Sequence, residues 1–361
     1  MRIGVIGAGQ LGQMLALAGF PLALRFQFLD SSADAPGAQV APIVVGAFDD
    51  VSALRRLAAD VDLVTYEFEN VPVAALHEMA ATRACFPPVD ALRVSQDRVL
   101  EKELFGRLDI PTPPWRAIDS RADLDAAIAA LGLPCVLKTR RLGYDGRGQR
   151  VLRGHADLDP AWEALGGVPL ILEGFVAFER EVSIVGARST TGETRAYPIV
   201  TNTHREGILR VTVAPTREAR LQRAAEGHLR RVMDHFGYAG VLTLEFFVER
   251  GRLVANEMAP RVHNSGHWTL EGAVTSQFEN HLRAILGLPL GDTKAVGHAA
   301  MVNFIGELPD RALTLAVPGV HWHDYGKAPR PGRKLGHATV VSRTAAGRDA
   351  LLEKLLRLVP S

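Results

Sequence analysis

Hydrophobic and polar positions change in regular blocks through the first hundred residues. Short apolar runs are separated by stretches in which apolar residues recur at helical spacing. Buried parallel strands joined by helices have this appearance. The pattern predicts strands at 2–6, 24–29, 42–45 and 63–65, and helices at 11–18, 51–59 and 73–80. We therefore expect a doubly wound α/β domain with a parallel sheet.

The pattern changes after a proline cluster at 111–114, which follows a helix predicted over 97–108. Proline has no backbone N–H and cannot continue a helix, so we place a domain boundary there. Ser120 and Asp123 form a predicted capping box at the start of a helix over 121–131. The further predicted elements are strands at 135–138, 149–152, 170–172, 182–185, 195–200 and 209–213, a helix at 217–236, and a hairpin of 241–248 with 253–257. Closely spaced strands are typical of an α+β domain with antiparallel pairing.

The C-terminal part of the chain follows a second predicted boundary. A helix over 277–286 leads to Gly287-Leu288-Pro289, and a β-rich segment then ends in a helix over 349–358. The fold class expected from the whole pattern is a multidomain protein that combines α/β and α+β parts.

Composition and charge exclude several classes of protein. Of the 361 residues, 47% are hydrophobic and 22% are charged, which is typical of a globular protein. The 41 basic and 40 acidic residues nearly cancel, and we expect no nucleic-acid partner. Two cysteines cannot form a disulfide framework, and no apolar segment reaches the roughly 20 residues that span a bilayer. We expect a cytoplasmic protein without a membrane partner.

The segment from Gly7 to Gly12 matches the G-x-G-x-x-G pattern between the first strand and the first helix. Asp30 ends the second strand, where an acid that binds a ribose would lie in a dinucleotide-binding fold. The loop and the helix N-terminus could also bind another phosphorylated ligand. A close-packed turn without a ligand is the third interpretation, and the residues alone leave all three open.

A basic, glycine-rich loop follows Lys138 at the end of a predicted strand. The segment 141–149 contains three glycines together with Arg141 and Arg147. Such a loop can expose backbone amides to a polyphosphate, which the lysine would meet as a point charge. Phosphate binding is therefore favoured over an ordinary surface hairpin.

Glu173 ends another apolar strand, with Glu179 and Glu181 nearby. A carboxylate or a backbone group there could bind the adenine amino edge or the ribose hydroxyls. Acidic residues at strand ends usually lie in solvent. From these residues alone, a solvated acid is the favoured interpretation.

Two acids in the predicted hairpin carry the strongest chemical signal. Glu245 lies among large apolar residues, and Asn256-Glu257 follows on the paired strand. Neighbouring carboxylates in an apolar setting are stabilised by a divalent cation, and their hard oxygens favour magnesium or manganese. Glu245 and Glu257 share a face only with an odd-length loop or a bulge, because a two-residue turn at Arg250-Gly251 would place Asn256 opposite Glu245.

Two further polar segments follow the hairpin. The loop after the second strand would bring Arg261, His263, Asn264 and Ser265 to an anionic reacting group. Late in the chain, Lys327 and the turn 333–337 contain basic side chains that could hold a monophosphate, although a lone basic turn is usually solvated.

These features together resemble the ATP-grasp superfamily. Four segments are similar to signatures of the 5-(carboxyamino)imidazole ribonucleotide synthetase family of purine biosynthesis: GQLG at 9–12, GYDGRGQ at 143–149, NEMAPRVHNSGHW at 256–268 and GRKLGH at 332–337. The resemblance covers essentially the whole chain. It implies a Rossmann-like domain at 1–110, an ATP-grasp domain at 111–290 with a lid at about 113–185, and a small β-rich domain at 291–361. Leu142 departs from the pattern, since the family commonly has a second glycine there.

The resemblance also implies a site. ATP would be bound by Arg98, Lys138, Gly143, Tyr144, Asp145, Gly146, Arg147, Gly148, Gln149, Glu173, Gly174, Phe175, Val176, Glu181, His204, Asn256 and Glu257. Magnesium or manganese would be held by Glu245 and Glu257. Aminoimidazole ribonucleotide and bicarbonate would be received by Gln10, Leu11, Ser265, Lys327, Arg333 and Lys334, with Arg261, His263 and Asn264 as the catalytic residues.

The implied activity is that of an ATP-dependent ligase, and the family suggests a homodimer. Bicarbonate would attack the γ-phosphoryl group of ATP, and the resulting carboxyphosphate would deliver its carboxyl group to the exocyclic amine of the ribonucleotide. Two alternatives stay open. One is an NAD-dependent dehydrogenase that uses Gly7–Gly12 and Asp30, and the other is a nucleotide-binding regulator without catalytic activity.

Overall fold

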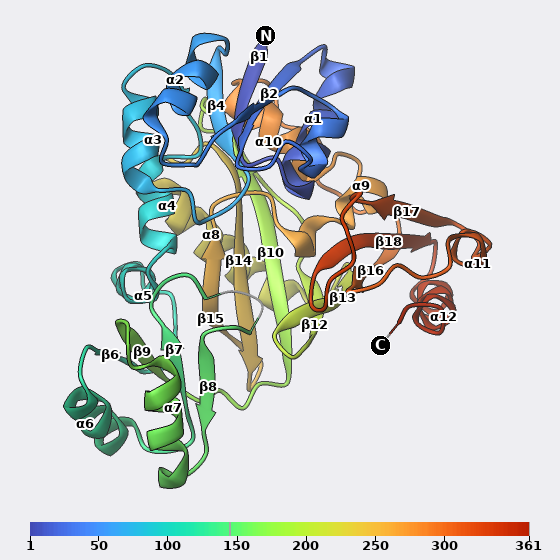
Figure 1. The fold of residues 1–361 in the computed structure, drawn as a ribbon. Helices are drawn as coiled ribbons and strands as arrows, with labels where there is room; N and C mark the ends of the chain where they lie inside the picture. Colours follow the sequence, from blue (N-terminus) through green and yellow to red (C-terminus); the bar gives the residue numbers. More distant parts are fainter. Residues whose placement is uncertain (144–145, 361) are drawn as a thin grey trace.

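A computed structural model describes residues 1–143 and 146–360, which form three β-sheets surrounded by helices (Figure 1). The sheets have five, nine and four strands. The nine-stranded sheet lies in the middle of the molecule, between the N-terminal sheet and the four-stranded sheet. The predicted combination of an α/β part with an antiparallel α+β part is confirmed.

The N-terminal sheet is parallel, as the block pattern predicted. Its strands are β1 (Arg2–Ile6), β2 (Arg25–Asp30), β3 (Ile43–Val45), β4 (Leu63–Tyr66) and β5 (Ala84–Cys85). Their order is β3-β2-β1-β4-β5, and every pair is parallel. Its helices are α1 (Gln10–Gly19), α2 (Val51–Ala59), α3 (Val73–Ala80) and α4 (Val89–Ser95), with short 3₁₀ turns η1 (Phe20–Leu22) and η2 (Pro36–Gln39). The sequence pattern missed β5 and α4, which are both short.

The nine-stranded sheet is antiparallel and joins the middle of the chain to its C-terminal part. Its strands are β10 (Arg180–Arg188), β11 (Thr194–Ala196), β12 (Val200–Arg205), β13 (Ile208–Ala214), β14 (Gly240–Glu249), β15 (Arg252–Ala259), β16 (His298–Ile305), β17 (Val320–Asp324) and β18 (Lys334–Ser342). The order is β15-β14-β10-β12-β13-β16-β18-β17, and β11 pairs with β10. The β-rich C-terminal segment therefore extends the central sheet through the pairing of β13 with β16.

Helices around this sheet connect its strands and join it to the N-terminal part. They are α5 (Arg98–Arg107), α8 (Ala219–His235), η4 (Asn264–Gly266), α9 (Thr269–Gly272), α10 (Gln277–Ile285), α11 (Arg311–Leu315) and α12 (Ala345–Leu356). Helix α10 contacts both α1 and β14, which ties the parallel sheet to the central one. None of the helices in the described part of the chain is both long and apolar enough to cross a membrane.

A four-stranded antiparallel sheet forms a separate layer at the lower end of the molecule in Figure 1. Its elements are β6 (Trp115–Ile118), α6 (Arg121–Leu131), β7 (Cys135–Thr139), β8 (Gln149–Leu152), η3 (His155–Asp157), α7 (Leu158–Leu165) and β9 (Leu170–Gly174). Helices α6 and α7 bury their apolar residues against one face of this sheet. The sequence pattern missed α7.

The strand predicted at 195–200 is wrong. Residues 194–196 form β11 and β12 begins only at Val200, so Pro198 lies in the gap between two strands. Because proline cannot donate to a strand ladder, it interrupts the pairing there. The predicted capping box is formed only in part. Ser120 Oγ accepts the Asp123 N–H, and the Asp123 carboxylate accepts the N–H of Asp119 together with the hydroxyl of Ser120.

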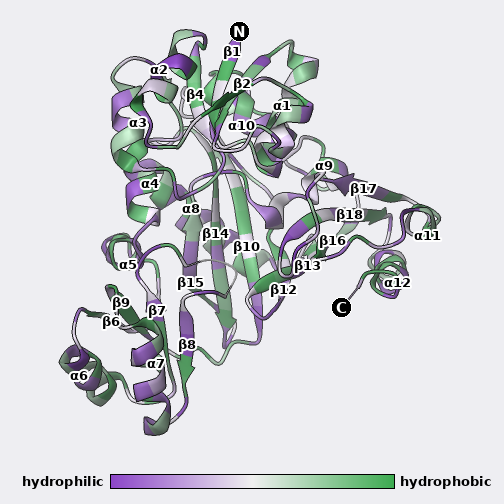
Figure 2. Ribbon diagram, in the orientation of Figure 1, coloured by the Kyte–Doolittle hydropathy of each residue, from purple (hydrophilic) through white to green (hydrophobic). Residues whose placement is uncertain are grey.

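The buried core follows the apolar runs of the sequence. Figure 2 shows mostly hydrophobic colouring along β1 and β4, whereas α7 combines hydrophobic and hydrophilic residues. The interior of the parallel sheet includes Ile3, Val5 and Phe28, all of which are fully buried. Ligands of parallel α/β sheets bind at the carboxyl ends of the strands, so this edge of the sheet can supply side chains of a site.

Candidate active site

The β14–β15 hairpin places Glu245 directly opposite Glu257. The turn at Arg250-Gly251 has two residues, and both have positive φ angles of 50° and 68°. That turn alone would pair Asn256 with Glu245, but a bulge between Glu245 and Phe246 shifts the register by one residue. The bulge predicted as one condition for this carboxylate pair is therefore present.

The two carboxylates differ in pKa because their surroundings differ. Burial, reinforced by the charge of Glu257, raises the pKa of Glu245 to about 7. Desolvation would also raise the pKa of Glu257, but the charges of Arg98 and Lys138 outweigh it and hold that pKa below its usual value. Arg98 Nη1 lies 3.2 Å from Glu257 Oε2. Two neighbouring carboxylates of this kind offer the hard oxygen ligands that magnesium prefers.

No cluster of three His, Cys, Asp or Glu side chains suited to a metal ion occurs in the described residues 1–143 and 146–360. A magnesium ion at Glu245 and Glu257 would therefore take its remaining ligands from phosphate oxygens and water. Magnesium sites beside nucleotides usually have this composition. The carboxylate pair fits such an ion.

Glu173 is buried, and the interpretation as a solvated acid is wrong. Its carboxylate lies 2.9 Å from Lys138 Nζ through Oε2 and 3.8 Å from Lys102 Nζ through Oε1. Burial would raise the pKa of Glu173, but the charges of these lysines outweigh it and lower the pKa to about 2. Burial lowers the pKa of Lys138 in turn. Lys138 of β7, Glu173 of β9 and Lys102 of α5 thus form a buried ion cluster. The local sequence pattern did not indicate this cluster.

The glycine loop after β7 adjoins this cluster. Arg98 Nη2 lies 3.5 Å from the Gly143 carbonyl oxygen, and the Thr139 N–H donates to the Gly148 carbonyl at 2.8 Å. Leu142 is 75% exposed and has a φ of 62°, a conformation that favours glycine. This conformation explains why a glycine suits position 142, at which the chain departs from the pattern of the family that it resembles. Tyr144 and Asp145, both predicted to bind nucleotide, lie outside the described residues.

A cavity of about 400 Å³ opens beside the carboxylate pair. Residues from all three parts of the chain line this cavity. Two of them, Gln10 and Lys327, are 317 positions apart in the sequence. The predicted site residues that line it are Gln10, Leu11, Gly143, Arg147, Glu245, Glu257, Arg261, His263, Asn264, Lys327, Arg333 and Lys334. Lys138, Glu173, Glu181, His204 and Ser265 are not among the lining residues.

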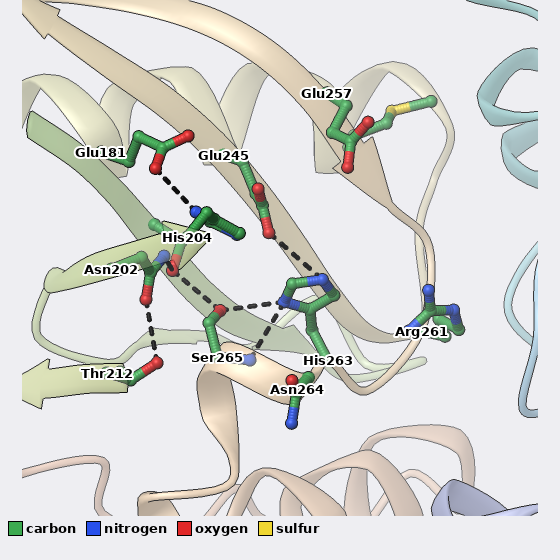
Figure 3. Close-up of polar contacts among 12 residues, drawn as sticks. Glu181, Asn202, His204, Thr212, Glu245, Glu257, Arg261, His263, Asn264 and Ser265 are labelled. Atoms are coloured by element: carbon green, nitrogen blue, oxygen red, sulfur yellow. Dashed lines mark hydrogen bonds and ion pairs between the residues drawn. The ribbon is translucent and has the colours of Figure 1, made fainter. Parts of the chain in front are cut away.

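The loop after β15 carries Arg261, His263 and Asn264 (Figure 3), and these side chains line the cavity. His263 Nε2 lies 3.2 Å from Glu245 Oε1, and Arg261 Nη2 lies 2.8 Å from Glu69 Oε1. The Asn264 amide exchanges two hydrogen bonds with Asn303 of β16, at 3.0 and 2.7 Å. Burial, followed by the charge of Arg261, lowers the pKa of His263 well below its usual value.

Glu181 and His204 form a pair on the neighbouring strands β10 and β12. His204 Nδ1 lies 2.7 Å from Glu181 Oε2. Burial would lower the pKa of His204, but the hydrogen bond with Glu181 and the charge of Glu245 raise it above its usual value. The other residues predicted to contact nucleotide in this region, Gly174 to Val176, continue from the end of β9, where Phe175 is exposed.

The N-terminal glycine loop is occupied by the protein's own carboxylates. Glu67 accepts the N–H groups of Gly9 and Gly12 at 2.7 and 3.0 Å, and Asp30 accepts the N–H of Ala8 at 2.8 Å. A Cβ atom on Gly9 would lie only 2.5 Å from Glu67 Oε1. A side chain at Gly9 would therefore displace the Glu67 carboxylate, which occupies these amides in place of a dinucleotide pyrophosphate.

Several lining residues were not predicted from the sequence. Glu67 and Glu69 follow β4 at the carboxyl edge of the parallel sheet, and Arg330 lies in the basic C-terminal segment. Ligands of parallel α/β sheets bind at the carboxyl ends of the strands, so the acids after Tyr66 could have been recognised as candidates. Lys327 donates to Gln10 Oε1, and burial lowers the pKa of Lys327 to about 8.

Three family models match the chain in sequence order. The ribonucleotide synthetase preATP-grasp domain matches residues 1–96, the ATP-grasp domain matches 103–278, and the phosphoribosylaminoimidazole carboxylase C-terminal domain matches 299–350. These models account for all three parts of the fold.

Relatives match over nearly the full length. An N5-carboxyaminoimidazole ribonucleotide synthase of Pseudomonas aeruginosa is 53% identical over 359 residues, which cover 99% of both chains. The crystal structure of such a synthetase from Thermus thermophilus superposes with a TM-score of 0.96 at 52% identity and covers 99% of both chains. An enzyme from Aspergillus clavatus in complex with ADP and 5-aminoimidazole ribonucleotide has a TM-score of 0.93 at 32% identity, with 99% of this chain and 98% of that chain covered. The chain belongs to the N5-carboxyaminoimidazole ribonucleotide synthase family of ATP-grasp ligases.

Proposed function

We propose that this chain uses ATP and bicarbonate to carboxylate the exocyclic amine of 5-aminoimidazole ribonucleotide in purine biosynthesis. The main support for this proposal is the cavity, which is lined both by the Glu245–Glu257 pair and by the basic side chains of Lys327, Arg333 and Lys334. An acidic metal site for the triphosphate and a basic site for a monophosphate are thus adjacent. The family of the chain agrees with this assignment.

The nucleotide would lie between the central sheet and the four-stranded sheet. We assign the predicted ATP residues to this position because Arg98 contacts both Glu257 and the carbonyl of Gly143 in the glycine loop. Lys138 forms a buried ion pair with Glu173. When bound at Glu245 and Glu257, magnesium or manganese would neutralise charge on the phosphates. Lys138 and Arg98 would orient the triphosphate for attack by bicarbonate on the γ-phosphoryl group.

Carboxyphosphate, formed with ADP, would break down to carbon dioxide and phosphate beside the ribonucleotide amine. The intermediate hydrolyses readily, so water must be excluded during the reaction. We propose that the segment at about 113–185 is the lid that closes over the nucleotide. We also propose that domain boundaries lie at residues 110 and 290, that the protein forms a homodimer and that it is located in the cytoplasm.

The decisive assay measures ADP release with each substrate omitted in turn. Release that requires both bicarbonate and aminoimidazole ribonucleotide supports the ligase. Saturable NADH fluorescence without ATP turnover would instead indicate the dehydrogenase, and ATP binding without turnover would indicate the regulator. Each of the three functions therefore has its own result.

Replacing Lys334 by alanine tests the monophosphate site. We expect the KM for the ribonucleotide to rise about 10- to 100-fold, because a charge-assisted hydrogen bond to phosphate is lost. The KM for ATP should change much less. Lys354→Ala, on the exposed side of α12, is the matched control. An equal rise in both KM values would remove Lys334 from the monophosphate site.

The lowered pKa of Lys327 predicts that the KM for the ribonucleotide depends on pH. Burial lowers its pKa to about 8, whereas the charge of Glu67 acts in the opposite direction. Below that pH the ammonium group is charged and can attract the phosphate, and above it the charge is lost. The KM for the ribonucleotide should therefore rise as the pH increases through about 8. Lys327→Arg should flatten this rise, since arginine stays protonated, and an unchanged profile would contradict the assignment.

A further inference from the structure

A buried chain of hydrogen bonds leads from β13 to the active-site loop (Figure 3). Thr212 Oγ1 donates to Asn202 Oδ1 at 2.9 Å, and Asn202 Nδ2 donates to Ser183 Oγ at 2.9 Å. Ser183 Oγ donates to Ser265 Oγ at 2.8 Å, and Ser265 Oγ lies 2.9 Å from His263 Nδ1. The first four side chains are at most 4% exposed. Buried polar groups connected in this way fix one arrangement of hydrogens.

The end of the chain identifies the unprotonated nitrogen of His263. The backbone N–H of Ser265 points at Nδ1 with an N···N distance of 3.2 Å. A backbone N–H can only donate a hydrogen bond. Nδ1 must therefore accept, and it carries no hydrogen in this arrangement.

The directions within the chain agree with this assignment. Ser183 accepts from the Asn202 amide, so its single hydrogen is directed to Ser265. Ser265 accepts that hydrogen bond, which leaves its own hydrogen for His263 Nδ1. Each hydroxyl thus accepts one hydrogen bond and donates another. The opposite tautomer would leave the Ser265 backbone N–H facing a second N–H group.

The other ring nitrogen of His263, Nε2, is directed to Glu245 of the carboxylate pair. His263 Nε2 lies 3.2 Å from Glu245 Oε1. We propose that the Thr212–Asn202–Ser183–Ser265 chain holds His263 as the neutral tautomer protonated at Nε2, so that His263 donates a hydrogen bond toward the cavity and is not a general base there. This inference deepens the proposed function and rests on it for the identity of the reaction.

The assignment divides the roles among these residues. His263 is a candidate catalytic residue because it lines the cavity, whereas Ser183, Asn202 and Ser265 are positioning residues. The proton released by the substrate amine must go to an acceptor other than His263 Nε2. An N–H donor at that place can orient Glu245 or stabilise an oxyanion.

Nitrogen NMR of the full-length protein tests the tautomer without substrate. The histidine rings are labelled with ¹⁵N, and the His263 signals are assigned by their loss in His263→Asn. We expect a non-protonated Nδ1 and a protonated Nε2 at His263. A protonated Nδ1, alone or together with Nε2, would overturn the inference. The ADP-release assay is a separate experiment, so a failure of the proposed function would be seen there and not in this spectrum.

Asn202→Asp tests the positioning chain at nearly constant side-chain volume. An ionised aspartate only accepts, so the Ser183 hydrogen would turn toward it and the Ser265 hydrogen toward Ser183. Nδ1 would then keep only the backbone N–H of Ser265 as a donor, which weakens the preference for the tautomer protonated at Nε2. We expect the tautomer signal to shift and kcat to fall about 10- to 100-fold, with a smaller change in the KM for ATP. If the tautomer and kcat stay as in the parent protein, or kcat stays while the tautomer shifts, the inference is wrong.

Two variants accompany this test. Thr243→Val removes a buried hydroxyl that has no hydrogen-bond partner among the described residues, and we expect an unchanged tautomer and kcat. Should Asn202→Asp fail to fold, Ser183→Ala breaks the same chain without adding charge. A mixture of tautomers and a reduced kcat in Ser183→Ala support the inference, whereas parent-like values for both contradict it.

Discussion

Replacing Glu257 by glutamine is expected to reduce ADP formation about a thousandfold while the fold survives. The amide keeps the size of the side chain but loses the charge that the metal requires and that Arg98 pairs with at 3.2 Å. The side chain is 40% exposed toward the cavity, so the change creates no fully buried unpaired group. A coupled assay for ADP, with the far-UV and near-UV circular dichroism of both proteins, measures the two parts of this prediction.

A matched variant separates this effect from a general effect on the hairpin. Glu249 ends β14 and pairs in register with Arg252 beside the turn, away from the cavity. Glu249→Gln should retain the parent rate. Unchanged ADP formation by Glu257→Gln would refute the metal assignment for Glu257.

Replacing Lys102 by methionine is expected to lower the free energy of unfolding by about 3 kcal/mol. The lysine is 1% exposed, and its Nζ donates to the carbonyl of Asn256, the extra residue of the β-bulge, at 2.5 Å. It also lies 3.8 Å from Glu173 Oε1. Methionine fills a similar volume but leaves the carbonyl unpaired and removes one of the charges that stabilise Glu173.

Chemical denaturation of the full chain measures this loss as a lower transition midpoint. Lys354→Met, on the exposed side of α12, is the control for the same chemical change in solvent. We also expect a higher magnesium requirement, because the bulge sets the register of Glu257. A midpoint equal to that of the control would show that Lys102 does not support the bulge.

The parallel sheet was predicted well because its signal is local. Each strand, such as β1, is a short apolar run, and each connecting helix, such as α2, has a continuous amphipathic pattern. The two strands of the hairpin could be predicted from the sequence. The register between them could not, because the local pattern does not show whether a bulge is present. The carbonyl of Asn256 in the bulge accepts a hydrogen bond from Lys102 of α5, which lies 154 positions away.

Other features depend on contacts that no local pattern contains. Glu173 resembles a solvated strand-end acid until Lys102 and Lys138 are brought to it by the fold. The interruption at Pro198 was readable from the sequence, since proline rarely occurs inside a paired strand. The polar chain behind His263 begins at Thr212, and serine, threonine and asparagine at such positions give no signal of their own.

The central claim is that Glu245 and Glu257 together hold a divalent ion beside the triphosphate. The most direct measurement is the anomalous scattering of crystals grown with Mn²⁺ and a non-hydrolysable ATP analogue. We predict one strong peak between the two carboxylates, within about 2.0–2.3 Å of an oxygen of each and of a phosphate oxygen. Nucleotide bound at the glycine loop, with the manganese peak located away from both carboxylates, would contradict the account.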